Sequence, residues 1–122
     1  MTAQRAAALI NGGKAADARA IAREADALDG RRPSVEALGR AEHTRAVLRE
    51  VLRLYPPSWI LPRRCVEEDV IDGYRIPAGA DVLMSQYVTQ RDPRLWDDPD
   101  RFDIERFAPS RAASRHRYAF MA

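Results

Sequence analysis

The chain has 122 residues, so it is at most one domain or a part of one. Its hydrophobic share of 46% and charged share of 31% are typical of a folded globular protein and exclude a disordered one. The net charge of +2 is too small to indicate nucleic-acid binding. No apolar run approaches the roughly 18 residues of a membrane helix, so no membrane segment is expected. The single cysteine excludes an intramolecular disulfide and favours a reducing, cytoplasmic location.

Two helices are predicted in the first third of the sequence, each with residues typical of a helix end. A helix is predicted over residues 15–28, where alanine, isoleucine and leucine recur at the three-and-four spacing of one helix face. Gly30 is expected to end it, because glycine readily takes the left-handed conformation that closes a helix. Ser34 is then predicted to cap a short helical turn that Gly39 ends.

The helix predicted over residues 42–55 is the strongest element of the chain. Its valine and leucine side chains fill one broad arc at 100° per residue, and Glu50 lies at the margin of that arc. Pro56 and Pro57 end the helix, because proline disfavours helical geometry in the residue before it. The helix therefore carries a carboxylate beside an apolar face immediately before a forced stop.

The position of Glu50 predicts a specific set of partners. An exposed pair with Arg53, three residues on, would contribute only about 0.2–0.5 kcal/mol. A partly buried carboxylate is costly unless it is paired and fully hydrogen-bonded. One arginine of the same helix cannot saturate both oxygens, so a second guanidinium is expected. Arg101 and Arg106 are the candidates, because each precedes a phenylalanine that could anchor it.

Short strands and turns are predicted after the proline pair. Strands are expected within residues 59–66, 74–79 and 81–86, separated by Asp-Gly and Ala-Gly turn signals. Residues 86–93 are predicted to form a helical turn, and residues 95–110 an ordered loop. Three aromatic side chains are expected to anchor this loop: Trp96, Phe102 and Phe107.

Five sequence landmarks, taken in order, resemble the cytochrome P-450 family of haem-thiolate monooxygenases. They are EVLR with the LYPP that follows it, LPR, GYRIPAG, RDP and FDIERF. The resemblance covers residues 15–122 and implies a mainly α fold with a few short β-strands. The piece would comprise the J helix, the K helix, part of the small sheet and the meander of that fold. Residues 1–14 are left as an unassigned extension.

The resemblance assigns roles to individual residues. The family's Glu-Arg-Arg triad, which holds the meander to the K helix, corresponds to Glu50, Arg53 and Arg106. The arginine that reaches a haem propionate corresponds to Arg63, while Arg64 is interpreted as a surface residue. Four residues would line the substrate side of the haem, although a plain core strand would have the same composition: Ser58, Trp59, Ile60 and Leu61.

Two positions depart from the family pattern, and neither removes a charge of the triad. Gln90 stands where the family usually has histidine before RDP, and Ile104 stands where the meander motif has proline. Cys65 lies on the wrong element to be the haem ligand and is expected to be a small buried hydrophobe. The family's ligand cysteine lies in a loop that would follow Ala122, so no metal ligand is assigned.

The two histidines, His43 and His116, are the remaining side chains considered as metal ligands. Neither has a second ligand nearby at metal spacing, so both are interpreted as surface residues.

By resemblance, the function is the insertion of one oxygen atom of O2 into an apolar substrate. The cofactor would be haem, and electrons would come from a redox partner of the ferredoxin or reductase type. The isolated chain is expected to be inactive and to hold no haem, because the ligand cysteine and the oxygen-activating helix have no counterpart in it.

Two alternatives remain open. The chain could be a small non-catalytic binding module whose arginines, Arg111, Arg115 and Arg117, contact an anion. It could also be a truncated gene product that does not fold alone, because no strong element covers the apolar arc of residues 42–55.

Overall fold

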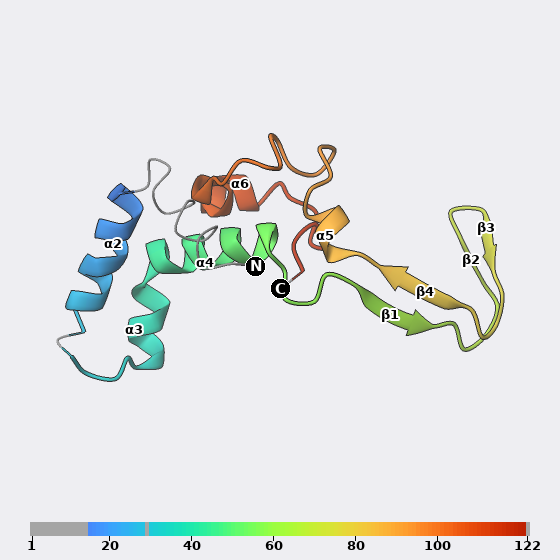
Figure 1. The fold of residues 1–122 in the computed structure, drawn as a ribbon, viewed down its shortest axis with the longest axis horizontal. Helices are drawn as coiled ribbons and strands as arrows, with labels where there is room; N and C mark the ends of the chain where they lie inside the picture. The colour runs from blue at the N-terminus through green and yellow to red at the C-terminus, as the bar shows by residue number, and fades with distance from the viewer. Residues whose placement is uncertain (1–14, 29, 122) are drawn as a thin grey trace. The chain divides into compact units, whose positions relative to one another are not determined.

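The computed structural model describes residues 15–28 and 30–121, which form two compact units. The first comprises the described residues up to Val51 together with Arg101–Ser114, and the second comprises Leu52–Asp100 and the residues from Arg115 on. These residues form five α-helices, one 3-10 helix and four short strands (Figure 1). The predicted fold, mainly α with a few short strands, is confirmed. The predicted extension, residues 1–14, lies outside the described residues.

The first unit begins with two helices, α2 (Ala15–Asp26) and α3 (Val35–Arg40). Gly30, between them, has a φ of 68°, which confirms its predicted left-handed conformation. Ser34 caps α3 as predicted, through a hydrogen bond of 3.2 Å from a backbone amide of the first turn to its Oγ. The prediction that Gly39 ends this helix is wrong, because α3 includes Gly39 and closes one residue later.

The longest helix among the described residues, α4, spans Glu42–Leu54 and supplies residues to both units. It ends before the two prolines, as the sequence predicts. Its apolar arc is unevenly covered by the described residues, since Leu54 is 3% exposed whereas Leu48 is 54% exposed.

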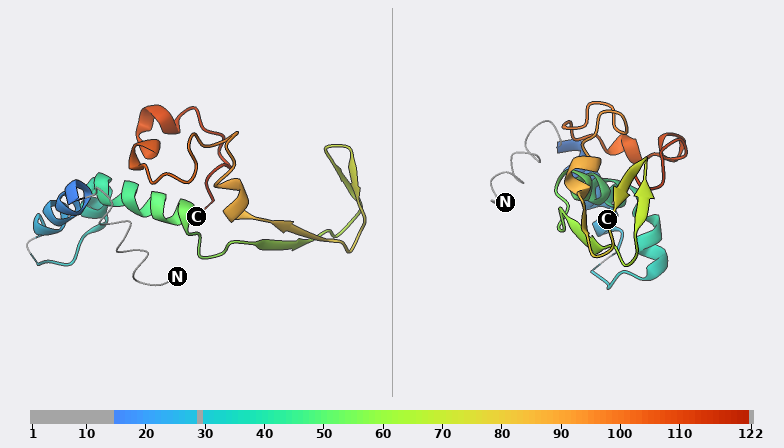
Figure 2. Two further views of the ribbon diagram at one scale, coloured as in Figure 1. Left: turned by 45° about the horizontal axis from the view of Figure 1, so that its top comes forward. Right: turned by 90° about the vertical axis from the view of Figure 1, so that its right-hand side faces the viewer.

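The second unit contains two antiparallel ladders of two strands each, whose members run side by side in Figures 1 and 2. In one, β1 (Leu61–Arg64) pairs with β4 (Asp81–Met84). In the other, β2 (Asp69–Ile71) pairs with β3 (Tyr74–Ile76). Strand β2 was not predicted, although the Asp72-Gly73 dipeptide that follows it is typical of a tight hairpin. Both turn residues have positive φ, 50° and 80°, as that turn requires.

Three short helical segments follow the ladders along the chain. The helical turn predicted after β4 is confirmed as α5 (Gln86–Thr89). The strand predicted over residues 81–86 is two residues too long, because Ser85 caps α5 with its side chain. The predicted loop over residues 95–110 contains the 3-10 helix η1 (Ile104–Phe107) and the start of α6 (Pro109–Ala112), both in the first unit.

The buried residues of the described chain are more often polar than apolar. Four are hydrophobic, which confirms burial for two of the three predicted aromatic anchors: Leu54, Trp96, Phe107 and Ala119. Five are polar or charged: Glu50, Arg53, Gln86, Gln90 and Arg106. Polar side chains therefore form the best-protected positions from which a functional site can be built. None of the helices in the described ranges has the length and apolar character needed to cross a membrane.

Candidate functional site

The centre of the candidate site in the first unit is Glu50, whose side chain is completely buried. Its Oε1 atom accepts a hydrogen bond of 2.8 Å from the backbone amide of Asp103. The Nε atom of Arg106 lies 3.5 Å from the same oxygen, and the Arg106 side chain is 3% exposed. A buried carboxylate is thus brought together with a cation and a backbone donor from 53 and 56 positions further along the chain.

Of the two arginines predicted as partners, Arg106 is the one that reaches Glu50. Its Nη2 atom also donates to the backbone carbonyl of Arg101 at 3.3 Å, which closes the loop between the two arginines. The guanidinium of Arg101 is exposed and pairs with Asp103 at 3.1 Å. The two arginines therefore play different parts in the same loop.

Asp103 organises the turn that presents Arg106, a role that was not predicted. Its Oδ1 atom accepts from the backbone amide of Glu105 at 3.1 Å and so caps η1. Its Oδ2 atom lies 3.1 Å from Arg101 and 3.2 Å from Arg111. Although desolvation raises the pKa of the Asp103 carboxyl, hydrogen bonds from Arg101, Glu105 and Arg111 hold it below its usual value. An aspartate immediately before a helical turn is a capping signal that could have identified this residue.

Arg53, in the second unit, is also completely buried. Its Nη1 atom donates to the backbone carbonyl of Gln90 at 2.7 Å. Its guanidinium carbon lies 5.0 Å from the centre of the Trp96 ring, within the range of a cation–π contact. Neither contact was predicted from the sequence, because both join residues that are about 40 positions apart.

The carbonyl end of α4 is closed by the two residues that follow α5. Gln90 donates from its side-chain amide to the carbonyls of Leu52 and Arg53, at 3.3 and 3.2 Å. Arg91 donates to the carbonyl of Leu54. Because the last four carbonyls of a helix have no partner within it, these donors satisfy three of the four at the end of α4.

The residues predicted to face haem and substrate lie on and before β1. Arg63 is exposed, and its Nη1 atom donates to the neighbouring carbonyl of Pro62 at 2.8 Å. Arg64 is exposed and pairs with Asp81 across the ladder at 3.0 Å. The four predicted lining residues divide into an exposed pair and a half-buried pair: Ser58 and Trp59, then Ile60 and Leu61.

The expectation that Cys65 is a buried hydrophobe is wrong. The thiol is half-exposed and donates to the backbone carbonyl of Glu67 at 2.9 Å. Cys65 directly follows β1 in a two-stranded ladder whose neighbouring strand residues are mostly exposed, so little covers it. Within the described residues, no group of three or more histidine, cysteine, aspartate or glutamate side chains is arranged to hold a metal ion.

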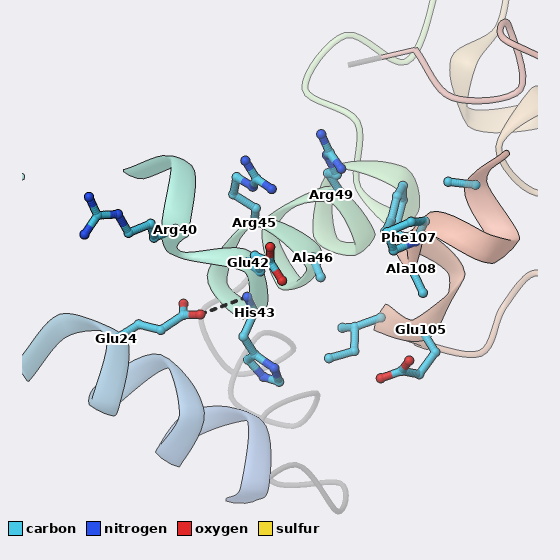
Figure 3. Close-up of a pocket in the computed structure, with 13 residues that line it drawn as sticks. Glu24, Arg40, Glu42, His43, Arg45, Ala46, Arg49, Glu105, Phe107 and Ala108 are labelled. Atoms are coloured by element: carbon cyan, nitrogen blue, oxygen red, sulfur yellow. Dashed lines mark hydrogen bonds between the residues drawn. The ribbon is translucent and has the colours of Figure 1, made fainter. Parts of the chain in front are cut away.

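A pocket of about 640 Å³ lies in the first unit, beside the beginning of α4 (Figure 3). Glu24, on α2, accepts hydrogen bonds of 2.9 Å from the backbone amides of His43 and Thr44 at its edge. His43 is half-buried rather than on the open surface, and its Nε2 atom lies 3.2 Å from Asp17. Although desolvation raises the pKa of the Glu24 carboxyl, hydrogen bonds from Thr44 and His43 lower it overall. Glu24 therefore serves as the N-terminal cap of α4, supplied by another helix.

The second histidine and the arginines near the end of the chain have partners within their own units. His116 is exposed, and its Nδ1 atom accepts from the amide of Tyr118 at 3.3 Å. Three arginines were candidates for anion binding. Arg111 pairs with Asp103, Arg115 lies 4.1 Å from the centre of the Trp96 ring, and Arg117 donates to the hydroxyl of Tyr118. These contacts give the arginines structural partners and provide no specific support for an anion site.

Comparisons with known proteins place this chain in a family. Residues 19–122 match the family described as Cytochrome P450. The chain is 37% identical over 113 residues to cyclooctatin synthase of Streptomyces melanosporofaciens, covering 93% of this chain and 25% of that protein. It is 43% identical over 94 residues to cyclooctat-9-en-7-ol 5-monooxygenase of the same organism, covering 77% of this chain and 20% of that protein. The chain thus spans a fifth to a quarter of these relatives, and it belongs to the cytochrome P-450 family.

Proposed function

We propose that this chain is the region of a haem-dependent monooxygenase that fixes the meander to the K helix. The whole protein would insert one oxygen atom of O2 into an apolar substrate, with electrons from a redox partner of the ferredoxin or reductase type. The observation that supports this proposal most is the complete burial of Glu50 between the amide of Asp103 and the guanidinium of Arg106. A carboxylate is costly to bury in an apolar core, so a completely buried one indicates a specific structural role.

The proposed triad of Glu50, Arg53 and Arg106 is structural. A buried carboxylate loses its hydration, so it is stable only where charged partners and hydrogen-bond donors are already in place. The planar guanidinium supplies several donors in a fixed geometry, which an ammonium group cannot reproduce. Glu50 and Arg53 lie three positions apart on α4, where neighbouring side chains can share partners. We infer that residues 101–107 keep their conformation through this carboxylate.

Arg63 is the residue proposed to bind a propionate of haem. An exposed guanidinium with further donors beyond its bond to Pro62 suits a propionate, so this residue fits the cofactor. When bound, haem would supply the iron at which O2 is activated. Arg63 would hold the carboxylate of the cofactor, and the segment Ser58–Leu61 would offer an apolar wall to the substrate. We propose that Cys65 is not the iron ligand.

The first experiment replaces Arg106 by lysine in the full polypeptide, meaning the whole protein of which this chain is proposed to be a region. Haem incorporation is measured from the absorption spectrum. Arg106→Lys retains the charge and loses the fork of donors, so we expect haem incorporation to fall sharply. Arg101→Lys is the matched control, because it makes the same change at an exposed arginine of the same loop. Full retention of the cofactor spectrum in Arg106→Lys would reject the triad.

A second experiment addresses the cofactor contact. Arg63→Gln is expected to weaken haem binding, whereas Arg64→Gln, at the neighbouring exposed arginine that already pairs with Asp81, is expected to leave it intact. Equal haem affinity in the two variants would contradict the role of Arg63.

Thiolate ligation of haem, which the proposed activity requires, is tested by reducing the full polypeptide with dithionite under carbon monoxide. A thiolate-type Soret band is expected, and its absence from a protein loaded with haem would overturn the proposed function. Applied to these 122 residues alone, the same test examines Cys65, the single cysteine. A thiolate-type band from that chain would show that Cys65 binds the iron.

Substrate binding is tested with cyclooctat-9-en-7-ol as the probe, since the name of one relative contains it.

A further inference from the structure

The side chain of Gln90 is completely buried in the second unit and uses both ends of its carboxamide. The Nε2 atom donates to the carbonyls of Leu52 and Arg53 in the last turn of α4, at 3.3 and 3.2 Å. The Oε1 atom accepts from the backbone amide of Met121 at 2.9 Å. One neutral group thus joins the carbonyl end of a helix to a backbone amide 31 positions further along the chain.

The backbone of Gln90 is held as firmly as its side chain. Its amide donates to the carbonyl of Gln86 at 2.8 Å, within the turn that ends α5. Its carbonyl accepts from the buried guanidinium of Arg53 at 2.7 Å. Because main chain and side chain are both bound to the end of α4, the carboxamide has little freedom to rotate. The position of its oxygen, and therefore of the Met121 amide, is set by α4.

The chemistry of the site restricts which side chain can serve there. The two helix carbonyls need a donor, and the amide of Met121 needs an acceptor. A carboxylate would face two carbonyl oxygens, and an ammonium group would offer no acceptor. A buried donor or acceptor left without its partner is destabilising. Only a neutral group with one donating and one accepting end satisfies both sides.

We propose that Gln90 is a positioning residue that fixes the backbone of residues 115–121 at Met121 against the last turn of α4, independently of pH. The inference is about the protein's own backbone, so it goes beyond the proposed function and uses that function for one readout only. Its direct readout is the hydrogen exchange of the Met121 amide.

The first test compares two leucine substitutions in the full polypeptide. Gln90→Leu keeps the size of the side chain and removes both polar ends, so the protection of the Met121 amide against exchange should fall by about fivefold to tenfold. Gln86→Leu is the matched control, because Gln86 is also a buried glutamine one helical turn away. It should leave that protection unchanged. Equal protection of the Met121 amide in the wild type and in Gln90→Leu would overturn the proposal.

The second test uses Gln90→His and a pH profile, which a merely space-filling role would not produce. A neutral imidazole has one donor and one acceptor, but its protonated form has two donors and no acceptor. Protection of the Met121 amide should therefore persist at pH 8 and be lost as the pH falls through the imidazole pKa, ordinarily about 6.5. The wild type should show no such step once intrinsic exchange is subtracted. A folded Gln90→His protein with a flat profile would contradict the proposal.

Other charged groups near Gln90 do not account for such a difference. Arg53, Arg91 and the carboxylate of Asp100, which lies 3.4 Å from Arg91, are present in both the wild type and Gln90→His, so they cannot produce a difference between the two profiles. His116 belongs to the same C-terminal segment, but it is present in both proteins, so the difference between them isolates the new imidazole.

The haem spectrum distinguishes failure of the proposed function from failure of the proposed role of Gln90. If neither the wild type nor Gln90→Leu binds haem, while exchange of the Met121 amide changes as expected, the proposed function fails and the role of Gln90 stands. If haem binds normally and the Met121 amide is indifferent to Gln90, the role of Gln90 fails alone.

Discussion

The buried contacts of the helices and the exposed β-ladders are built on opposite principles. The largest fully buried side chains of the described residues are polar, namely Arg53, Gln90 and Glu50. In the ladders and their turns, apolar side chains are exposed instead, with Val66 at 93% and Tyr74 at 76%. Among the described residues, polar side chains are therefore buried as readily as apolar ones.

This difference implies a difference in tolerance to substitution. A buried charged or amide group is stable only with particular partners in particular positions, so its replacement leaves another group unsatisfied. An exposed ladder is held by backbone hydrogen bonds and by its turn, and its side chains have few contacts to lose. Substitutions should therefore have their largest effects at the buried polar groups and their smallest effects in the ladders.

The largest effect is expected at Glu50. Glu50→Gln keeps the acceptor for the amide of Asp103 but removes the charge beside Arg106, which is then a buried cation without its carboxylate. The free energy of unfolding of the full polypeptide should fall by about 3–5 kcal/mol, as measured by urea denaturation. Glu105→Gln makes the same change at an exposed carboxylate two residues after Asp103, the cap of η1, and should cost less than about 0.5 kcal/mol. Similar losses in both variants would remove the distinction between the two kinds of position.

A smaller effect is expected at Glu24, which caps α4 from a half-exposed position. Glu24→Gln should cost about 1 kcal/mol, the usual contribution of an N-terminal cap. Because the pKa of this carboxyl is lowered in the folded protein, its stabilisation is present above the ordinary value of 4.5 and is lost as the pH falls through the lower folded value. The variant should therefore show a weaker loss of stability in acid than the wild type. An unchanged acid profile would contradict this role.

A modest gain is expected at Ile104, where the family motif has proline. Asp103 has φ −145° and ψ 101°, the extended geometry that a residue before proline requires. Ile104 is the first residue of η1, a position that suits the fixed φ of proline. Ile104→Pro should raise the free energy of unfolding by about 0.4–1 kcal/mol. Loss of the packing of the half-buried isoleucine side chain would reduce this gain. A loss greater than 1 kcal/mol would show that this loop differs from the geometry described.

The smallest effect is expected in the exposed turn after β1. Val66→Thr should change the free energy of unfolding by no more than about 0.5 kcal/mol, because 93% of Val66 is exposed. A larger change would mean that the full polypeptide covers this surface.

The sequence predicted the parts of this chain that depend on local chemistry. The helix over residues 42–54 follows from its apolar spacing and the two prolines, and Ser34 was recognised as a cap from its place before a helical turn. The triad pattern was recognised through its resemblance to a family, and the chain's membership of that family is confirmed. The structure brings Arg106 and Glu50 together, while the role of the triad stays a prediction.

The contacts that the sequence could not predict join distant positions. Glu24 caps a helix that begins 18 residues later, and Gln90 closes the end of that helix from further still. No periodicity or spacing identifies such partners, because they are set by how segments pack. The burial of Cys65 was wrongly predicted for the same reason, since a cysteine is buried only where another layer covers it.

The most direct test of this account is a double-mutant cycle on Glu50 and Arg106 in the full polypeptide. The free energy of unfolding is measured for the wild type, Glu50→Gln, Arg106→Gln and the double variant. If the carboxylate and the guanidinium stabilise each other, the double variant should lose less than the sum of the single losses, by at least about 1 kcal/mol. Losses that add to within about 0.5 kcal/mol would show that the two side chains act independently and would contradict the account.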